Sequence, residues 1–276
     1  WLFVSTHTSP TRGFGGPSVS FRSLISQISR RGKIYELITT YPYYKQNPGK
    51  IKNEYYYKTF IFHKIGFSIK ALFSIICRYR NTKVVFINGL TTFINFNTIF
   101  LFSFSSNTKV IIFPRGGLEY GRTNSWNILK KFFFNFQLRL IKNINNSNRL
   151  MVVFATQSEL SKSTLLSSNN NCILPNINSD LFIDKNINES RKFDLIYVGR
   201  FSPEKGIDRL ENILKLINKN PVISICVVFD SISPIDFKIL KSKYKSLNIH
   251  WHVGVANDEV HKMMRSSKYL FFPSYV

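Results

Sequence analysis

Residues 195–208 read Leu-Ile-Tyr-Val-Gly-Arg-Phe-Ser-Pro-Glu-Lys-Gly-Ile-Asp, and their types and spacing suit the binding of an anion. We expect an apolar strand that ends at Gly199, then a short loop, then a helix capped by Ser202. The start of a helix offers free backbone N–H groups and the positive end of a dipole. Arg200 adds a bidentate fork and Lys205 a point charge, so the segment suits a diphosphate. The alternative is an ordinary strand–turn–helix with surface charges.

Other candidate residues also follow expected strands. Gly15 and Gly16 come after an apolar strand over residues 2–6, where glycine lets a ligand approach the backbone closely, although a tight turn is the alternative. Asn88 ends another strand and has hydrogen-bonding groups for a sugar, or serves as a turn residue. Arg115 and Glu119 follow a further strand, and either meet a substrate or form a buried salt link with each other.

The elements that must position these residues alternate between strand and helix. Continuously apolar strands are expected at 2–6, 35–40, 55–62, 84–88, 110–113 and 151–155, and again at 193–198, 222–229, 249–253 and 269–272. The helices of the second series are expected at 203–218, 235–246 and 257–266, the last after Gly254 and Val255. This alternation predicts an α/β protein with doubly wound parallel sheets covered on both faces. The polar segment 177–191 is interpreted as a linker between domains at 1–176 and 192–276.

The composition narrows the class of protein. The chain has 276 residues, 44% of them hydrophobic, and a formal net charge of +23, which implies an anionic partner. Its three cysteines lie far apart in the sequence and are expected to be buried thiols. No Cys or His spacing suggests a metal site, so we expect no metal, and the basic residues form no nucleic-acid recognition pattern.

One predicted helix has a composition suited to a membrane surface. Residues 126–143 combine Lys130, Lys131, Arg139 and Lys142 with four phenylalanines. Such a helix suits an interface that carries anionic lipids, although many of its apolar residues could simply form core.

The string Gly199-Arg200-x4-Lys205-Gly206 resembles the donor-phosphate motif of retaining glycosyltransferases with the GT-B fold, family 4 in particular. The segment from Pro114 to Glu119 is similar to a Pro-Arg-Gly segment of the family, and Ala155-Thr-Gln-Ser-Glu159 to its helix-capping Ala-Thr-Ser-x-x-Glu. The resemblance covers most of the chain. It implies two Rossmann-like domains that face a cleft, the second one incomplete.

The resemblance also implies roles for individual residues. Arg200 and Lys205 would act in catalysis by neutralising the departing nucleoside diphosphate. The donor-binding positions would be Gly15, Gly16, Gly199, Gly206, Gly254 and Val255, and the residues facing the acceptor or the sugar would be Asn88, Arg115 and Glu119.

A UDP- or GDP-sugar would be the donor, with no cofactor and no metal. The acceptor would be a saccharide, expected on a polyprenyl lipid in the assembly of bacterial surface polysaccharide such as O-antigen. The protein would then work in the cytoplasm, at the anionic inner face of the plasma membrane, with no nucleic-acid partner.

Several departures from the family pattern keep alternatives open. Family members often have a His near the position of Arg115, and a Gly-x-Gly where Phe229-Asp230-Ser231 stands here. Two glutamates of the family are expected beyond Val276, so we expect the 276-residue chain to be inactive by itself. A second interpretation is therefore a non-catalytic basic module for anionic membrane or nucleic acid, and a third is a GT-B phosphorylase or epimerase.

Overall fold

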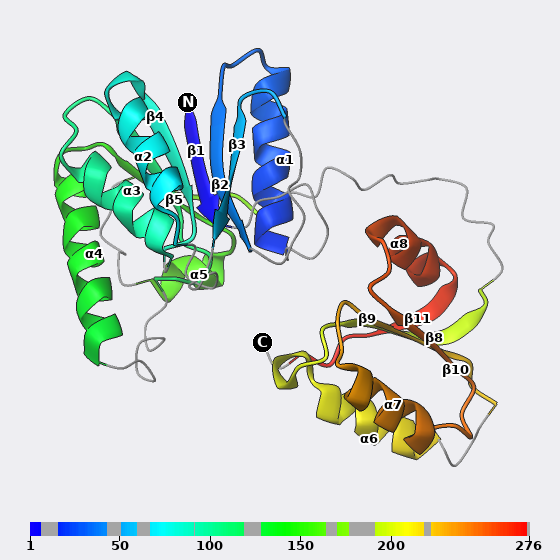
Figure 1. Cartoon of the computed structure of the whole chain (residues 1–276). Helices are drawn as coiled ribbons and strands as arrows, with labels where there is room; N and C mark the ends of the chain where they lie inside the picture. The colour runs from blue at the N-terminus through cyan, green and yellow to red at the C-terminus, as the bar shows by residue number, and fades with distance from the viewer. Residues whose placement is uncertain are drawn as a thin grey trace. The chain divides into compact units, whose positions relative to one another are not determined.

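The computed structural model describes residues 1–6, 16–42, 51–59, 67–90, 92–118, 128–163, 170–176, 191–217 and 222–274. The chain divides into two compact units, Trp1–Leu181 and Phe182–Val276 (Figure 1). Nearly all of the predicted linker, residues 177–190, lies outside the described ranges.

The first unit is built on a seven-stranded parallel sheet with the order β3-β2-β1-β4-β5-β6-β7. Its strands are β1 (Leu2–Thr6), β2 (Glu36–Pro42), β3 (Glu54–Thr59), β4 (Val84–Asn88), β5 (Lys109–Phe113), β6 (Leu150–Phe154) and β7 (Asn171–Ile173). Its helices are α1 (Gly16–Arg30), α2 (Ile69–Arg78), α3 (Phe93–Ser103), α4 (Ile128–Asn146) and α5 (Gln157–Ser161), with a 3-10 turn η2 (Tyr79–Asn81) after α2.

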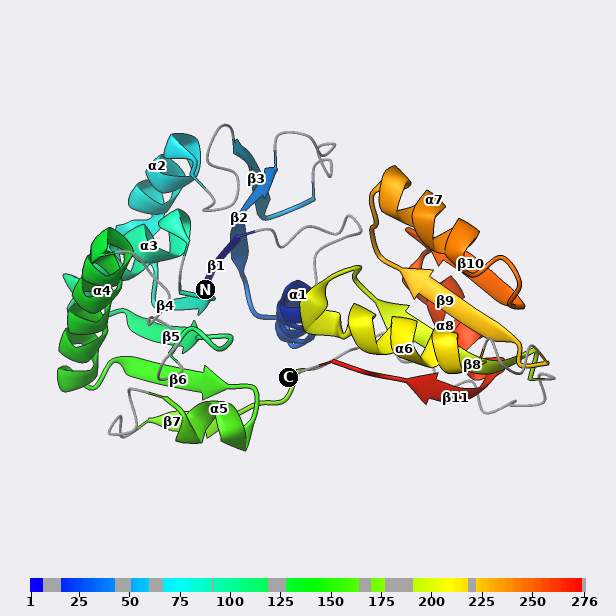
Figure 2. The ribbon, with the colours of Figure 1, turned by 90° about the horizontal axis from the view of Figure 1, so that it is seen from below.

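Helices cover both faces of this sheet, which explains why the strands are apolar without alternation. Helices α2, α3 and α4 lie on one face and α1 on the other (Figures 1 and 2). On the α3 side, Val4 and Ile87 pack with Ile99 and Ile141. On the α1 side, Phe3 packs among a separate set of buried residues: Phe21, Ile25, Leu37, Phe86, Phe113 and Val153.

The second unit has a four-stranded parallel sheet with the order β10-β9-β8-β11. Its strands are β8 (Phe193–Gly199), β9 (Ile225–Phe229), β10 (Ile249–Val253) and β11 (Ser267–Phe271). Its helical segments are the 3-10 turn η3 (Pro203–Lys205), α6 (Ile207–Ile217), α7 (Pro234–Lys243) and α8 (Asn257–Arg265). Leu210 and Leu240 bury α6 and α7 on one face of the sheet, and Val260 and Met264 bring α8 to the other.

The predicted doubly wound α/β class is confirmed, and the strand order shows where each sheet reverses its winding. The first sheet reverses between β1 and β4, and the second between β8 and β11. In open α/β sheets, ligands bind beyond the carboxyl ends of the strands at such a switch point. The end of β8 at Gly199 is therefore the position in the second unit where a ligand site is expected.

Several details of the prediction were wrong. Strand β9 starts at Ile225 rather than at residue 222, and β11 covers Ser267–Phe271 rather than 269–272. The short edge strand β7, with the sequence Asn-Cys-Ile, was not predicted because three mixed residues give no apolar pattern. Of the three cysteines, Cys77 and Cys172 are exposed, and Cys226 in β9 is buried as expected.

Candidate functional site

The loop between β8 and α6, residues 200–206, lies at the switch point of the second sheet. Strand β8 pairs with β9 on one side and with β11 on the other, so the loop has the ends of both neighbours beside it. The amide of Asp230 after β9 donates to the carbonyl of Gly199, and the amide of Gly254 after β10 donates to that of Phe229. These bonds fix the relative positions of three strand ends.

The loop is a 3-10 turn rather than the first turn of a long helix. The amide of Lys205 donates to the carbonyl of Ser202 at 3.0 Å, and the amide of Gly206 to that of Pro203 at 2.9 Å. Gly206 has φ +66°, a left-handed conformation, so the α-helix begins only at Ile207. The predicted helix over 203–218 is therefore divided. The Ser202 side chain makes no capping bond, because a tight turn, and not a helix, follows it.

Tyr197 supports this loop from the core of the second unit. Its side chain is fully buried, and its hydroxyl lies 3.4 Å from the carbonyl oxygen of Arg200 and 3.3 Å from that of Lys205. One O–H group is thus shared between the two residues predicted to bind phosphate. A Cβ atom at Gly199 would lie 2.8 Å from the same hydroxyl, so glycine at this position makes room for the tyrosine.

The other end of the loop is packed against the segment after β11. A Cβ atom at Gly206 would lie 2.3 Å from the carbonyl oxygen of Pro273, a distance at which backbone would have to move. The same carbonyl accepts a hydrogen bond from Nη1 of Arg209 at 3.2 Å. Gly206 is therefore required both by its φ angle and by the close approach of Pro273.

The two predicted phosphate-binding side chains are held loosely. Nη2 of Arg200 lies 3.7 Å from Oε2 of Glu204, and the two side chains are 60% and 81% exposed. Exposed ion pairs of this kind contribute at most about 1 kcal/mol, so a phosphate can replace the carboxylate. The Nζ atom of Lys205 lies 5.5 Å from the centre of the Phe272 ring. Both cations thus occupy one loop and are accessible to a ligand.

Gly254 and Val255 lie at the carboxyl end of the neighbouring strand β10. Gly254 has φ +64°, and a Cβ atom there would approach nothing closer than the carbonyl oxygen of Asp230 at 3.9 Å. Glycine is therefore required here by conformation and not by space. Val255 is partly buried against the core beneath α8. A donor contact for these two residues remains a prediction.

In the first unit, the structure brings Asn88 and Arg115 together at the carboxyl ends of β4 and β5. Nε of Arg115 donates to Oδ1 of Asn88 at 2.9 Å, Nη1 donates to Oδ1 of Asn176, and the guanidinium lies over the Phe113 ring. Asn88 is buried and its Nδ2 donates to Oγ of Ser5 at 3.1 Å. Asn88 therefore holds Arg115 in place, and its role as a direct sugar contact remains a prediction.

Arg115 is unusual in both its backbone and its charge. Its φ angle of +54° is left-handed, which L side chains rarely adopt. Burial lowers the pKa of its guanidinium below the usual range, and the charge of Glu159 opposes this effect only in part. The side-chain amides of Asn88 and Asn176, which accept its hydrogen bonds, are neutral, so they position the cation without cancelling its charge. Strained residues with this kind of support are typical of ligand sites.

Glu159 links the loops that follow β5 and β6, a role that the sequence did not reveal. Its buried carboxylate accepts hydrogen bonds from the amides of Gly116 and Ala155, and Thr156 caps α5 by accepting from the Glu159 amide at 3.1 Å. The predicted capping role of this segment is confirmed. The signal for the additional role was a glutamate in the third position of a helix only five residues long.

For three of the predicted residues, the structure gives no evidence of a role in the site. Gly15 and Glu119 lie outside the described residues, so the predicted salt link between Arg115 and Glu119 stays untested. Gly16 begins α1, and a Cβ atom there would meet nothing within 4 Å, so space does not demand glycine.

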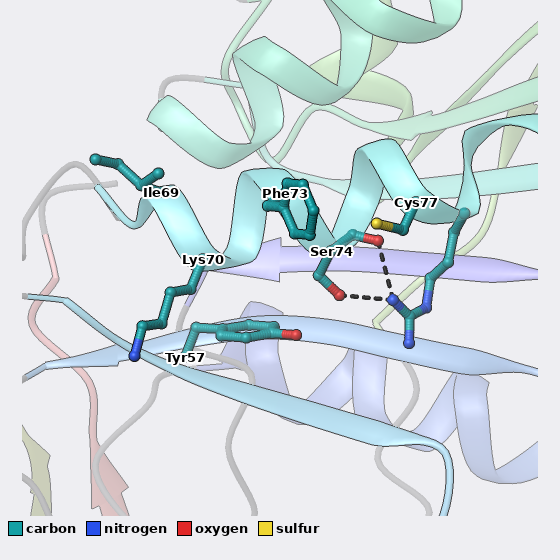
Figure 3. A pocket seen from close by; sticks show the side chains of 7 residues that line it. Tyr57, Ile69, Lys70, Phe73, Ser74 and Cys77 are labelled. Atoms are coloured by element: carbon teal, nitrogen blue, oxygen red, sulfur yellow. Dashed lines mark hydrogen bonds between the residues drawn. The ribbon is translucent and has the colours of Figure 1, made fainter.

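A hollow of about 530 Å³ lies elsewhere, between α2 and β3 (Figure 3). Tyr57, Ile69, Lys70 and Phe73 line it, and Nη1 of Arg78 bonds to both the carbonyl and the hydroxyl of Ser74 at its side. None of the residues predicted for a site lines this hollow.

Neither a metal centre nor a membrane-spanning helix is found in the described ranges. No cluster of three or more His, Cys, Asp or Glu side chains there could hold a metal ion. No helix in those ranges combines the length and the apolar character that a membrane crossing needs.

Comparison with known proteins agrees with this architecture. Residues 178–276 match the family described as glycosyl transferases group 1. An alpha-glucosyltransferase solved in complex with UDP and a 13-mer DNA matches with a TM-score of 0.58 and 9% identity, over 100% of this chain and 72% of that one. MurG of Acinetobacter baumannii matches with a TM-score of 0.53 and 12% identity, over 98% and 72%.

The pneumococcal O-GlcNAc transferase GtfA, solved with UDP and GlcNAc, has a TM-score of 0.50 at 11% identity, over 76% of this chain. The chain spans about two fifths of the length of GtfA, and of TarM from S. aureus. No curated protein matches the sequence. Identities this low establish the fold alone.

The family match covers the whole described part of the second unit, including the loop with Arg200 and Lys205, and the structural matches span both units. The expected resemblance is therefore confirmed: the chain has the GT-B fold, and its residues 178–276 match the glycosyl transferases group 1 family.

Proposed function

We propose that this protein is a retaining glycosyltransferase that moves a sugar from a nucleotide-sugar donor to a saccharide acceptor. The observation that carries the proposal is the position of Arg200 and Lys205. Both lie on one loop at the switch point of the second sheet, inside the segment that matches the glycosyl transferases group 1 family. A doubly wound sheet binds its ligand there.

The proposed mechanism is electrostatic. As the bond between the sugar and the diphosphate breaks, negative charge grows on the departing phosphate oxygens. The guanidinium of Arg200 would hold those oxygens through paired N–H donors, and the ammonium of Lys205 would add a second positive charge. The loop is fixed in advance by Tyr197 and Gly206, so little reorganisation is needed at the moment of reaction. We propose that these two side chains make a bound metal unnecessary.

The donor is proposed to be a UDP- or GDP-sugar. Two of the similar structures, the alpha-glucosyltransferase and GtfA, were solved with UDP. Gly254 and Val255, at the end of strand β10, are proposed to contact the nucleobase through their backbone groups. A backbone contact does not depend on residue type. The residues at these positions therefore do not distinguish a uracil from a guanine base.

The acceptor is proposed to be a saccharide carried on a polyprenyl lipid, in the assembly of bacterial surface polysaccharide. Residues 1–181 contain 23 of the 38 lysines and arginines but only 5 of the 15 acidic residues, a formal charge of +18. Such a surface favours an anionic membrane, as the cytoplasmic face of a plasma membrane would provide. Arg115, held by Asn88 and Asn176, is proposed to meet the acceptor or the sugar.

The test is transfer from labelled UDP- and GDP-sugars to a lipid-linked saccharide, with the anomeric configuration of the product read by NMR. We expect transfer with retention, and about a hundredfold or greater loss of kcat in Arg200→Ala, as for removal of one electrostatic stabiliser. The assay uses the natural gene product. Transfer with inversion would contradict the proposed mechanism.

A non-catalytic module for anionic membranes would behave differently. It would bind vesicles but not nucleoside diphosphates, and Arg200→Ala and Lys205→Ala would leave its binding unchanged. That outcome would replace the proposed function.

A further inference from the structure

We infer that the outer surface of α3 and α4 binds the interfacial layer of an anionic membrane. The inference deepens the proposed function, on which it rests for the lipid-linked acceptor, but the surface can be tested separately. We call this surface the aromatic ridge, and define it by six residues: Phe96, Phe100, Phe104, Phe132, Phe133 and Phe136.

The ridge is a continuous chain of ring contacts across two helices. Ring centres of Phe96 lie 6.0 Å from Phe133 and 6.1 Å from Phe136. Phe100 continues the chain, 6.4 Å from Phe136 and 5.1 Å from Phe104, and Phe132 lies 6.0 Å from Phe133. Helices α3 and α4 run side by side on the outside of the first sheet (Figures 1 and 2).

The ridge is not needed to close the core of the first unit. Helix α4 already buries Phe134, Gln137, Ile141 and Ile144 on its inner side. On the outer side, Phe104 is 69%, Phe132 64% and Phe133 51% exposed. A contiguous set of exposed aromatic rings is unusual on a soluble surface and marks an interaction site.

The charge around the ridge indicates an anionic partner. The sequence has no acidic residue between Glu54 and Glu119, and none between Glu119 and Glu159, so α2, α3 and α4 lack acids entirely. Helix α4 contains Lys130, Lys131, Arg139 and Lys142. Arg139 is exposed and follows Phe136 by three residues, which puts it on the same side of the helix.

Aromatic rings bordered by cations and free of acids suit a membrane better than a nucleic acid. Moving phenylalanine rings from water to the boundary of the acyl chains is favourable, because it removes apolar surface from water. Lysine and arginine side chains reach the anionic head groups beside them. Binding to duplex phosphates needs the cations but leaves the apolar rings in water. The charge of +18 in the first unit adds long-range attraction to an anionic leaflet.

The experiment is flotation of the protein with vesicles of phosphatidylcholine alone and of phosphatidylcholine with phosphatidylglycerol. We expect the wild type to bind the anionic vesicles. The partition coefficient of Phe132→Ser/Phe136→Ser should be at least about tenfold lower, because two aromatic side chains are no longer available for transfer from water into the membrane. Arg139→Glu/Lys142→Glu should also weaken binding, with a smaller dependence on salt concentration. The matched control Lys215→Glu/Lys238→Glu makes the same charge change on exposed residues of the second unit and should bind nearly as the wild type does.

Three controls distinguish membrane binding through the ridge from misfolding, donor binding and nucleic-acid binding. Circular dichroism and UDP affinity should be unchanged in the ridge variants, which excludes misfolding and separates the ridge from the donor site. Arg200→Ala should float with vesicles like the wild type, so failure of the donor site would not affect this test. Equal flotation of wild type and ridge variants would overturn the inference, and so would no flotation at all. Duplex DNA binding that the ridge variants weaken equally would also overturn it, in favour of a nucleic-acid surface.

Discussion

The hydroxyl of Tyr197 lies 3.3 Å from the backbone carbonyl of Lys205, so a buried residue of β8 directly supports a residue of the proposed donor site. The same hydroxyl is 3.4 Å from the carbonyl of Arg200. The two cations of the loop are thus linked through their backbones, although the side chain of Arg200 is exposed and that of Lys205 is half-buried. The position of the charge depends on a core tyrosine that carries no charge itself.

Replacing Tyr197 by Phe should destabilise the second unit modestly and weaken nucleotide binding. Loss of a hydrogen bond of this kind costs about 1 kcal/mol in unfolding free energy. The matched control is Tyr269→Phe, because Tyr269 in β11 is 71% exposed and its hydroxyl should contribute little. Urea denaturation measures the stability, and calorimetry with UDP the affinity. Equal effects of the two substitutions would show that the Tyr197 hydroxyl does not hold the loop.

Gly206→Ala should be clearly more destabilising than Gly254→Ala. Both residues have φ near +65°, a conformation that costs an L-residue about 1–2 kcal/mol. At Gly206 the new Cβ would also meet the Pro273 carbonyl at 2.3 Å, whereas at Gly254 nothing lies closer than 3.9 Å. We expect the difference between the two variants to be about 1–3 kcal/mol. A Gly206→Ala variant as stable as Gly254→Ala would contradict the packing described for Pro273.

Glu159→Gln should destabilise the first unit by about 2 kcal/mol, because an amide can accept at only one of its two positions. The carboxylate now accepts from the amides of both Gly116 and Ala155, so one N–H would lose its buried partner. Glu36→Gln is the control, since the ion pair of Glu36 with Arg78 is partly exposed and should contribute about 1 kcal/mol or less. Thermal unfolding of the two variants distinguishes these expectations.

The cysteines should differ in reactivity in the folded protein. Burial raises the pKa of the Cys226 thiol to about 11, so at pH 8 only about one molecule in a thousand carries the thiolate that reacts. Cys77 is exposed and should be alkylated readily by iodoacetamide. Since the thiolate fraction of Cys226 rises as pH approaches its pKa, its labelling should begin only at high pH or on unfolding. Mass spectrometry of labelled peptides reads each site, and rapid labelling of Cys226 at pH 8 would show that β9 is not buried as described.

The sequence predicted much of the architecture because the strands of a doubly wound sheet are buried on both faces. The strands β1, β4 and β10 begin and end at the predicted residues, and β1 and β4 are almost entirely buried. The 3-10 turn at Pro203–Lys205 was missed because the apolar pattern of the helix does not show the left-handed conformation of Gly206, which ends the turn. Helix α8 is capped by Ala256, whose side chain makes no capping hydrogen bond and gives no capping signal in the sequence.

The candidate site was predictable where its residues are close together in the sequence. Gly199, Arg200, Lys205 and Gly206 form a local string that a single loop brings together. The contacts of Arg115 with Asn88 and Asn176 come from three separate segments of the chain, and their pairing is fixed by the strand order of the sheet. The salt link of Arg115 with Glu119, which the sequence offered as one alternative, stays a prediction because Glu119 lies outside the described residues.

The central claim is that Arg200 and Lys205 bind the diphosphate of a nucleotide donor. Isothermal titration of UDP and GDP into the wild type, Arg200→Ala, Lys205→Ala and the control Lys215→Ala tests it most directly, because Lys215 is an exposed lysine of α6 in the same unit. We predict about tenfold or greater weakening in each of the first two variants, as expected for the loss of a charge-assisted hydrogen bond, and no change in the control. Unchanged affinity in Arg200→Ala and Lys205→Ala would contradict the account.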